Sequence, residues 1–101
     1  MQVWAILSRS DLTKADLTSA ILTRASLSNA NLTNANLCNA DLREANLTET
    51  HLSGANLREA NLTGTILTGA ILYGTNLTSA NLTNASLRAI LVGASLGRET
   101  R

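Results

Sequence analysis

The chain has 101 residues, of which 45% are hydrophobic but only 2% aromatic, and it contains no proline. Eight basic residues nearly balance seven acidic ones, so the formal net charge is +1. This balance offers neither the basic surface that nucleic-acid binding requires nor a strong acidic field. The length is that of one domain, and we therefore predict a single domain over 1–101 that does not bind nucleic acid.

A five-residue repeat runs through most of the chain. Every fifth residue from Leu7 to Leu87 is leucine, and the residue two places earlier is always alanine, serine or threonine. This period does not follow one face of an α-helix, because each leucine would advance by roughly 140° around the axis. It does not fit a plain strand, because Ala15 and Ala20 would point to opposite faces. The chain must turn once per unit, which predicts a β-solenoid of stacked, paired coils.

Many units share the order alanine, then aspartate or asparagine, then leucine. Examples are Ala15-Asp16-Leu17, Ala30-Asn31-Leu32, Ala35-Asn36-Leu37 and Ala60-Asn61-Leu62. In these units the chain resembles the pentapeptide-repeat family over nearly its whole length. The resemblance implies an all-β fold, a right-handed quadrilateral β-helix of about five coils with four pentapeptides each, and an interior of leucines and small residues.

Asparagine or aspartate precedes most of the leucines, at a position that faces outward in such a fold. These short side chains bond nearby backbone at turns and stack in columns. With twenty residues per coil, one column contains Asp16, Asn36, Asn56 and Asn76. We interpret this column as structural and not as a ligand site.

Groups that could support chemistry are few. Cys38 and His51 are the only cysteine and histidine, and both occupy outward positions. A lone histidine does not predict a metal site, and a lone cysteine cannot form an intramolecular disulfide and fits a reducing compartment. An interior filled by leucine and alanine leaves no room for a pocket. We therefore predict no enzyme activity, no catalytic residue, no cofactor or metal, and no small-molecule substrate.

The N-terminal segment suggests a location in the cell. Met1–Leu7 is too short for a signal peptide or a membrane span, lacks a basic start and leads directly into the repeat. We therefore expect a cytoplasmic protein with no membrane partner. The family resemblance supplies an alternative, because members also occupy the periplasm or the thylakoid lumen, in which case an export signal has been removed.

Charge is distributed unevenly. The segment from Asp41 to Glu59 holds four acidic residues and two arginines, Arg43 and Arg58, each followed directly by glutamate. We interpret these as surface ion pairs of small energetic value. Some family members resemble duplex DNA in shape and charge and bind DNA gyrase. The net charge of +1 and the short chain argue against such mimicry here, which we keep as an alternative function.

An outward apolar group interrupts the polar pattern. It consists of Ile66, Ile71 and Tyr73. These residues occupy positions that usually carry asparagine or threonine, within a stretch that has no charged residue, from Ala60 to Leu87. Exposed apolar clusters mark partner surfaces. The alternative is that isoleucine is simply tolerated at this position, as it is at residues 6 and 21.

The repeat is interrupted near the C-terminus. The unit that begins at Ala85 has only four residues, so regular repeats occupy 5–88 and an irregular coil or cap occupies 89–101. Solenoid ends require covers, because terminal coils expose core and unpaired backbone. The candidate end caps or dimer contacts are Met1, Trp4, Ile90, Leu91 and Val92. Neither end is strongly polar, and we therefore expect a homodimer through the coil ends.

Together these features favour a non-catalytic structural or protein-interaction module, built on a rigid rod and directed at an unidentified protein partner. The alternative is a DNA-mimic binder of gyrase or topoisomerase. A weaker alternative is binding to a lattice such as ice, because columns of asparagine and threonine repeat at about the coil spacing.

Overall fold

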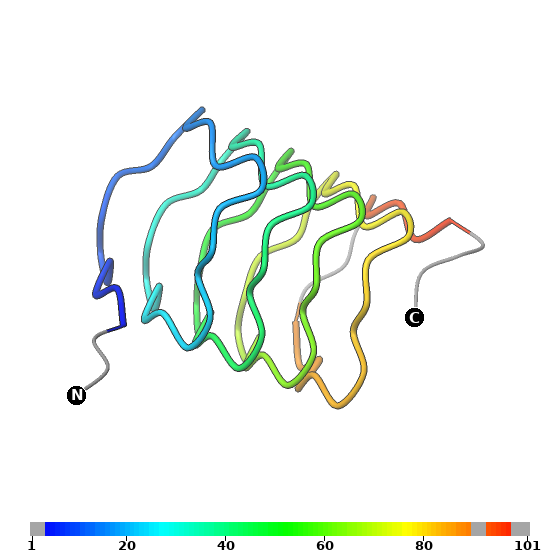
Figure 1. Cartoon of the computed structure of the whole chain (residues 1–101). Coiled ribbons are helices and arrows are strands. Elements are labelled where there is room, and N and C mark those ends of the chain that lie inside the picture. Colours follow the sequence, from blue (N-terminus) through cyan, green and yellow to red (C-terminus); the bar gives the residue numbers. More distant parts are fainter. Residues whose placement is uncertain (1–3, 90–92, 98–101) are drawn as a thin grey trace.

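A computed structural model describes residues 4–89 and 93–97. The chain winds into a stack of coils, and the first and last described segments lie at opposite ends of the stack (Figure 1). Parallel bridges join residues twenty positions apart, for example Asn31 to His51 and His51 to Ile71. One coil therefore contains four pentapeptides. The two shorter dimensions of the molecule, 24 and 23 Å, are nearly equal, and the longest is 39 Å.

Each pentapeptide ends in a tight turn from its leucine to the next small residue. In one such turn the N–H of Ala35 donates to the carbonyl of Leu32 at 3.0 Å, and Asn34 has a φ of 60°. A positive φ at the third residue of a turn is typical of type II. Twelve non-glycine residues and six glycines of the described chain have a positive φ. The same turn therefore recurs along the rod and redirects the chain repeatedly in the same way.

The backbone amides of one unit explain the repeat motif. The amide of Asn31 donates to the preceding coil at 2.9 Å. The amides of Leu32 and Asn34 donate to the following coil at 2.7 and 2.9 Å, and that of Ala35 closes the turn. The remaining amide, on Thr33, donates to Oδ1 of Asn31 at 3.0 Å. All five amides of the unit are thus hydrogen-bonded, and one of these bonds requires a side-chain acceptor.

The same side-chain bond recurs wherever an acceptor precedes the leucine. All ten asparagines and aspartates at this position accept a hydrogen bond from the amide two residues later: Asp11, Asp16, Asn31, Asn36, Asp41, Asn46, Asn56, Asn61, Asn76 and Asn81. This is the Asx turn, which only a short acceptor side chain can form. The side chains of the polar column that includes Asp16 therefore stabilise the turns by accepting backbone hydrogen bonds.

The extended parts of the coil are very short. Within residues 4–89 and 93–97 there are isolated bridges and turns, but no helix and no continuous strand. We expected an all-β solenoid, and the pairing between coils is confirmed, but only one residue per pentapeptide forms a bridge. The physical reason is that two of the five residues form the turn and the chain then changes direction, so no side of the coil is long enough for a strand.

The leucines form one continuous core. Every repeat leucine from Leu27 to Leu77 is at most 1% exposed, and the intervening alanines are buried with them. The core is less well covered toward its C-terminal end, where Leu87 and Leu96 are 44% and 46% exposed. Burial of the leucines is thus confirmed for the central coils, and each buried leucine contributes about 1.5–3 kcal/mol.

Three threonines replace alanine in the interior without leaving a polar atom unpaired. The hydroxyls of Thr50 and Thr75 donate to carbonyls of the preceding coil, and that of Thr65 donates to the carbonyl at the start of its own turn. The Thr75 bond, to the carbonyl of Leu52, is 2.6 Å long. No buried side-chain nitrogen or oxygen of the described residues lacks a partner. The buried threonines therefore cost no unpaired polar group in the interior.

The register shifts near the C-terminus. Ile66 bridges Ser86, twenty residues later, but Asn76 bridges Ser95, only nineteen residues later. The N–H of Leu77 donates to the carbonyl of Ser95 at 2.7 Å. The chain thus resumes pairing after one residue has been lost from the repeat.

Candidate interaction surface

The bridges divide the exterior into four faces, each defined by one column of outward residues. Face 1 consists of Ile6, Ser26, Asn46, Ile66 and Ser86. Face 2 consists of Asp11, Asn31, His51 and Ile71. Face 3 consists of Asp16, Asn36, Asn56, Asn76 and Ser95. Face 4 consists of Ile21, Asp41, Asn61 and Asn81. Because the coils stack in register, residues far apart in sequence lie in one column.

The three residues of the predicted interaction group lie on one coil. Ile66 is on face 1 and is 44% exposed, whereas Ile71 is on face 2 and is half-buried. Tyr73 follows at the next turn and is 46% exposed, and its carbonyl accepts the amide of Gly54 at 2.8 Å. The group therefore extends around a corner of the rod, with Ile66 and Tyr73 as its accessible ends.

Two further isoleucines are more exposed than this group. Ile6 and Ile21 are 83% and 82% exposed, on faces 1 and 4 of the first coil. From the sequence, these two isoleucines were interpreted only as evidence that isoleucine is tolerated at the outward position. Their high exposure could have been predicted, because an outward residue on the first coil has a neighbouring coil on one side only.

Only one of the predicted end-cap residues lies within the described chain. Trp4 is 41% exposed, and the guanidinium carbon of Arg24 lies 5.1 Å from the centre of its ring, within the range of a cation–π contact. Met1, Ile90, Leu91 and Val92 lie outside the described residues. Closure of the coil ends and dimerisation through them therefore stay predictions.

The second residue after each leucine lies at a corner of the coil, and its chemistry changes from coil to coil. The first coil has Arg9, Lys14 and Ser19, and the second has Arg24, Asn29, Asn34 and Asn39. The third has Glu44, Glu49, Gly54 and Glu59, and the fourth has Gly64, Gly69, Gly74 and Ser79. From the first coil to the fourth, the corner residues therefore change from mainly basic, through mainly asparagine, to mainly glutamate and then to mainly glycine, and we call the glycine positions bare corners. This order is visible only when the sequence is read with a period of twenty.

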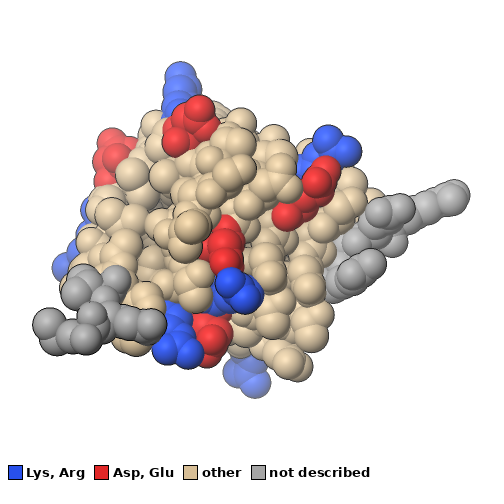
Figure 2. All heavy atoms as spheres, in the orientation of Figure 1, with Lys and Arg blue, Asp and Glu red and all other residues tan. Residues whose placement is uncertain are grey.

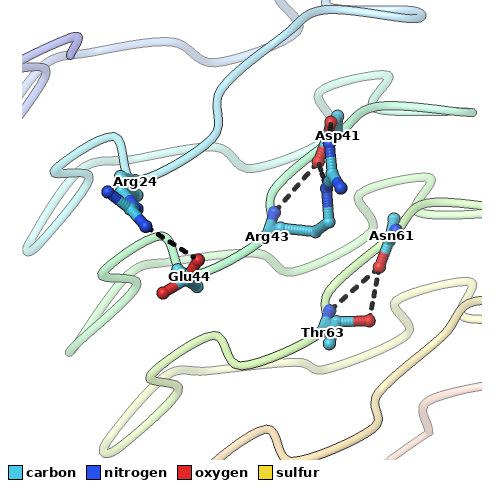
Figure 3. Close-up of polar contacts among 6 residues, drawn as sticks. All are labelled: Arg24, Asp41, Arg43, Glu44, Asn61 and Thr63. Carbon is cyan, nitrogen blue, oxygen red and sulfur yellow. Dashed lines mark hydrogen bonds and ion pairs between the residues drawn. The ribbon is translucent and has the colours of Figure 1, made fainter. Parts of the chain in front are cut away.

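On the face shown in Figure 2, many basic and acidic side chains lie next to one another, with wide areas of uncharged surface between these groups. We expected each of two arginines to pair with the glutamate that follows it, and this is confirmed for Arg58 and Glu59, whose charged groups are 3.7 Å apart. It is wrong for Arg43, which binds both carboxylate oxygens of Asp41 at 2.6 and 2.8 Å. Glu44 instead contacts Arg24 of the preceding coil at 3.4 Å (Figure 3). Arg43 thus pairs within its own unit, with the acceptor of its Asx turn, whereas Glu44 pairs with a residue twenty positions earlier.

Local hydrogen bonds stabilise the charged form of the aspartates. The pKa of Asp41 is lowered chiefly by its hydrogen bond from Arg43, and the pKa of Arg43 is raised in turn by Asp41. The pKa values of Asp11 and Asp16 are lowered chiefly by the hydroxyls of Thr13 and Thr18. These carboxylates are therefore engaged in turns and are poor candidates for acid–base chemistry.

The described residues contain no group of three or more histidine, cysteine or acidic side chains that could hold a metal ion. His51 is exposed on face 2, between Asn31 and Ile71. Cys38 is a half-buried free thiol beside the amide of Asn39. No helix within the described chain is long and apolar enough to cross a bilayer.

The comparison with solved structures gives two informative matches. A pentapeptide repeat protein from the thylakoid lumen of Arabidopsis thaliana is 30% identical, with a TM-score of 0.86 over 89% of this chain and 63% of that chain. One from the cyanobacterium Cyanothece 51142 is 38% identical, with a TM-score of 0.58 over 94% of this chain and 62% of that chain. The chain thus spans less than two thirds of either protein.

Other comparisons carry less information about function. The fluoroquinolone resistance protein QnrB1 is 17% identical over 94% of this chain and 63% of that chain, with a TM-score of 0.42, which is too distant to support a shared activity. No functionally curated protein matches the chain.

The sequence itself matches the family model for pentapeptide repeats (8 copies) over residues 4–34, 20–58, 51–90 and 60–98. These segments include nearly all of the coils whose turns, bridges and leucine core are described above. The chain therefore belongs to the pentapeptide-repeat family.

Proposed function

We propose that the chain is a non-catalytic protein-interaction module. Its rod, right-handed and of about five coils as in its family, holds side chains at fixed positions for a protein partner. The observation that carries this proposal is the surface of the fourth coil. There, Ile66 and Tyr73 are 44% and 46% exposed in a stretch without charge.

One corner of the same coil favours close approach by a partner. Gly74, next to Tyr73, has no side chain, and nothing lies within 4 Å of the point where its Cβ would stand, so a partner surface can reach the turn backbone there. The acidic corners of the preceding coil border this region. A partner with an apolar strip beside basic residues would match it in shape and charge.

The two alternative functions gain less support from the described surface. Mimicry of DNA requires dense negative charge, whereas acidic corners are confined to one coil. Lattice binding requires uninterrupted columns of threonine, but the column that begins with Thr13 and Thr33 continues with Ser53 and ends in Tyr73. A supercoiling assay and a thermal-hysteresis measurement would each test one alternative directly.

The location of the protein bears on the search for a partner. The cytoplasm stays our prediction, and the similarity to a protein of the Arabidopsis thylakoid lumen supports the alternative. The partner should therefore be sought by affinity capture from both compartments of the native cell.

The experiment is a comparison of affinities once a partner has been captured and purified. The test variant carries Ile66→Asn, Ile71→Asn and Tyr73→Thr, which restore the common repeat residues. The control is Ile21→Asn, the same exchange on face 4. We expect the test variant to bind at least about tenfold more weakly by calorimetry, and the control to bind like the wild type. Equal affinity of all three proteins would refute the proposed surface.

A further inference from the structure

Face 1 differs from the other three faces in having no carboxylate. Its column has exposed isoleucines on the first and fourth coils, Ile6 at 83% and Ile66 at 44%. The two residues between them, Ser26 and Asn46, are neutral and half-buried. Each of the other columns includes an aspartate. The column of face 1 is therefore the least costly of the four columns to remove from water.

The polar groups of face 1 are already engaged with one another. The hydroxyls of Ser8 and Ser26 are 2.6 Å apart, and Oδ1 of Asn46 accepts bonds from both the amide and the hydroxyl of Thr48. Covering the face would therefore leave few unpaired polar groups. The amide nitrogen of Asn46 remains available to donate to a facing acceptor.

The corner residues along the two edges of face 1 change in type from the first coil to the fourth, as described above. One edge runs through Trp4, Arg24, Glu44 and Gly64, and the other through Arg9, Asn29, Glu49 and Gly69. Figure 3 shows Arg24 and Glu44 at one corner of successive coils. On both edges the bulky or basic residues lie toward the N-terminal end, and the acidic residues and glycines follow. The edge that contains Arg24 and Glu44 is thus complementary to itself when its direction is reversed.

A two-fold axis that lies in the plane of the interface and perpendicular to the rod performs this reversal. It places the first coil of one copy against the fourth coil of the other, and the second coil against the third. Each edge of one copy then faces the same edge of the other copy. We propose that face 1 is the interface of an antiparallel homodimer. Such an interface is isologous, so every contact occurs twice.

In this arrangement the central column pairs in register. Ile6 packs against Ile66 of the second copy, and Ser26 faces Asn46 of the second copy. The serine hydroxyl can accept from the free amide nitrogen of the asparagine. The apolar contacts lie at the two ends of the interface and the polar contacts at its centre.

The residues on the edge that contains Arg24 also pair with those on the same edge of the second copy. Arg24 faces Glu44 of the second copy, which adds an intermolecular pair to the intrachain contact of 3.4 Å. At the ends, Trp4 faces Gly64, which has no side chain of its own and is flanked by the side chain of Glu44. On the other edge the same operation places Arg9 opposite Gly69 and Asn29 opposite Glu49, so the two symmetry-related Arg24–Glu44 contacts are the cation–anion pairs of the interface.

The size of the face limits the strength of association. Four coils at about 4.8 Å give a face roughly 20 Å square, on the order of 400 Å². Stable complexes bury about 800 Å² per partner, so the dimer should be weak and should dissociate further in salt. It covers Ile66, which the partner surface proposed above also uses, and leaves Ile71 and Tyr73 on the neighbouring face.

The decisive experiment mixes two charge-reversed chains. Arg24→Glu places glutamate opposite glutamate in its own homodimer, and Glu44→Arg places arginine opposite arginine. In the mixed dimer every reversed residue faces an opposite charge. By sedimentation velocity at close to millimolar concentration and low salt, we expect dimers for the wild type and for the equimolar mixture, and about tenfold weaker association for each variant alone.

Three results would overturn the proposal: a wild type that is monomeric at this concentration, single variants that associate as well as the wild type, or a mixture no stronger than its components. A merely structural effect of either exchange would not be relieved by mixing. Circular dichroism of each variant checks that the coil is intact. A dimer through the coil ends would be insensitive to these charges.

Cross-linking tests the register independently. In a Cys38→Ser background, Ile6→Cys together with Ile66→Cys should give a disulfide-linked dimer on mild oxidation. Ile6→Cys alone should not, because the two copies of residue 6 would lie three coils apart, about 14 Å. Efficient cross-linking of that single variant would indicate parallel rods and contradict the antiparallel interface.

Discussion

Thr63 donates two hydrogen bonds to Oδ1 of Asn61, one from its amide at 3.1 Å and one from its hydroxyl at 2.6 Å (Figure 3). The amide bond supplies the acceptor that the backbone of the turn lacks. The hydroxyl bond fixes the side chains against each other. Asn-Leu-Thr is therefore a self-contained turn, which accounts for its frequency in this chain.

Restoring this turn where it is missing should stabilise the protein. Ile21 is 82% exposed and is followed two residues later by Thr23, so Ile21→Asn creates the complete motif at little cost in buried area. We expect the free energy of unfolding to rise by about 1 kcal/mol, as one added hydrogen bond does. Urea denaturation measures the change. Ile21→Gln is the control, because its longer side chain cannot form the Asx turn, and equal stabilisation by both would contradict this explanation.

The sequence was sufficient for the core and the turns because both repeat every five residues. Leu52 is fully buried, and Asn61 forms the expected local bond, since each depends only on its place within the unit. The exterior depends on a second period, of twenty. Glu44 was assigned the wrong partner because its partner, Arg24, lies twenty residues earlier in the sequence and one coil away. Arg43 pairs instead with Asp41 of its own unit, the same carboxylate that accepts its backbone amide.

The same geometry explains why the acidic and bare corners were not foreseen. Glu44 and Glu49 appear in the sequence as scattered acids, and Gly64 and Gly69 as turn residues. Stacking places each glutamate directly before a glycine of the next coil, with Glu49 Cγ 3.0 Å from the point where a Cβ would stand on Gly69. Such a relationship follows only from the register of the coils.

Core truncation should be far more costly in the middle of the rod than at its end. Leu52 is 0% exposed and Leu87 is 44% exposed. Leu52→Ala should lower the free energy of unfolding by about 2–5 kcal/mol, because it leaves a cavity between coils. Leu87→Ala should cost less than about 1.5 kcal/mol, because water already reaches the side chain. Chemical denaturation of the two variants provides the comparison, and equal losses would show that the core does not weaken toward the end.

Adding a methyl group at corner glycines should separate backbone strain from crowding. Gly69 and Gly74 have φ values of +74° and +64°, so alanine is strained at both by about 1–2 kcal/mol. A Cβ on Gly69 would lie 3.0 Å from Glu49 Cγ, whereas one on Gly74 would meet nothing within 4 Å. Gly69→Ala should therefore be the more destabilising exchange in thermal unfolding. The difference should vanish in a Glu49→Ala background, and its persistence there would exclude crowding as the cause.

Acid should destabilise the rod through its aspartates. The pKa values of Asp11, Asp16 and Asp41 are lowered from 3.8 by hydrogen bonds that the unfolded chain does not make. A lowered folded-state pKa contributes stability that is fully present above the unfolded pKa and is lost as the pH falls through the folded one. We therefore expect the urea midpoint to be constant from neutral pH down to about 5 and to decline progressively below about 4. A variant with all three aspartates replaced by asparagine keeps the Asx acceptors but cannot be protonated there. Its midpoint should decline less over the same range, and a decline equal to that of the wild type would assign the acid sensitivity to other groups.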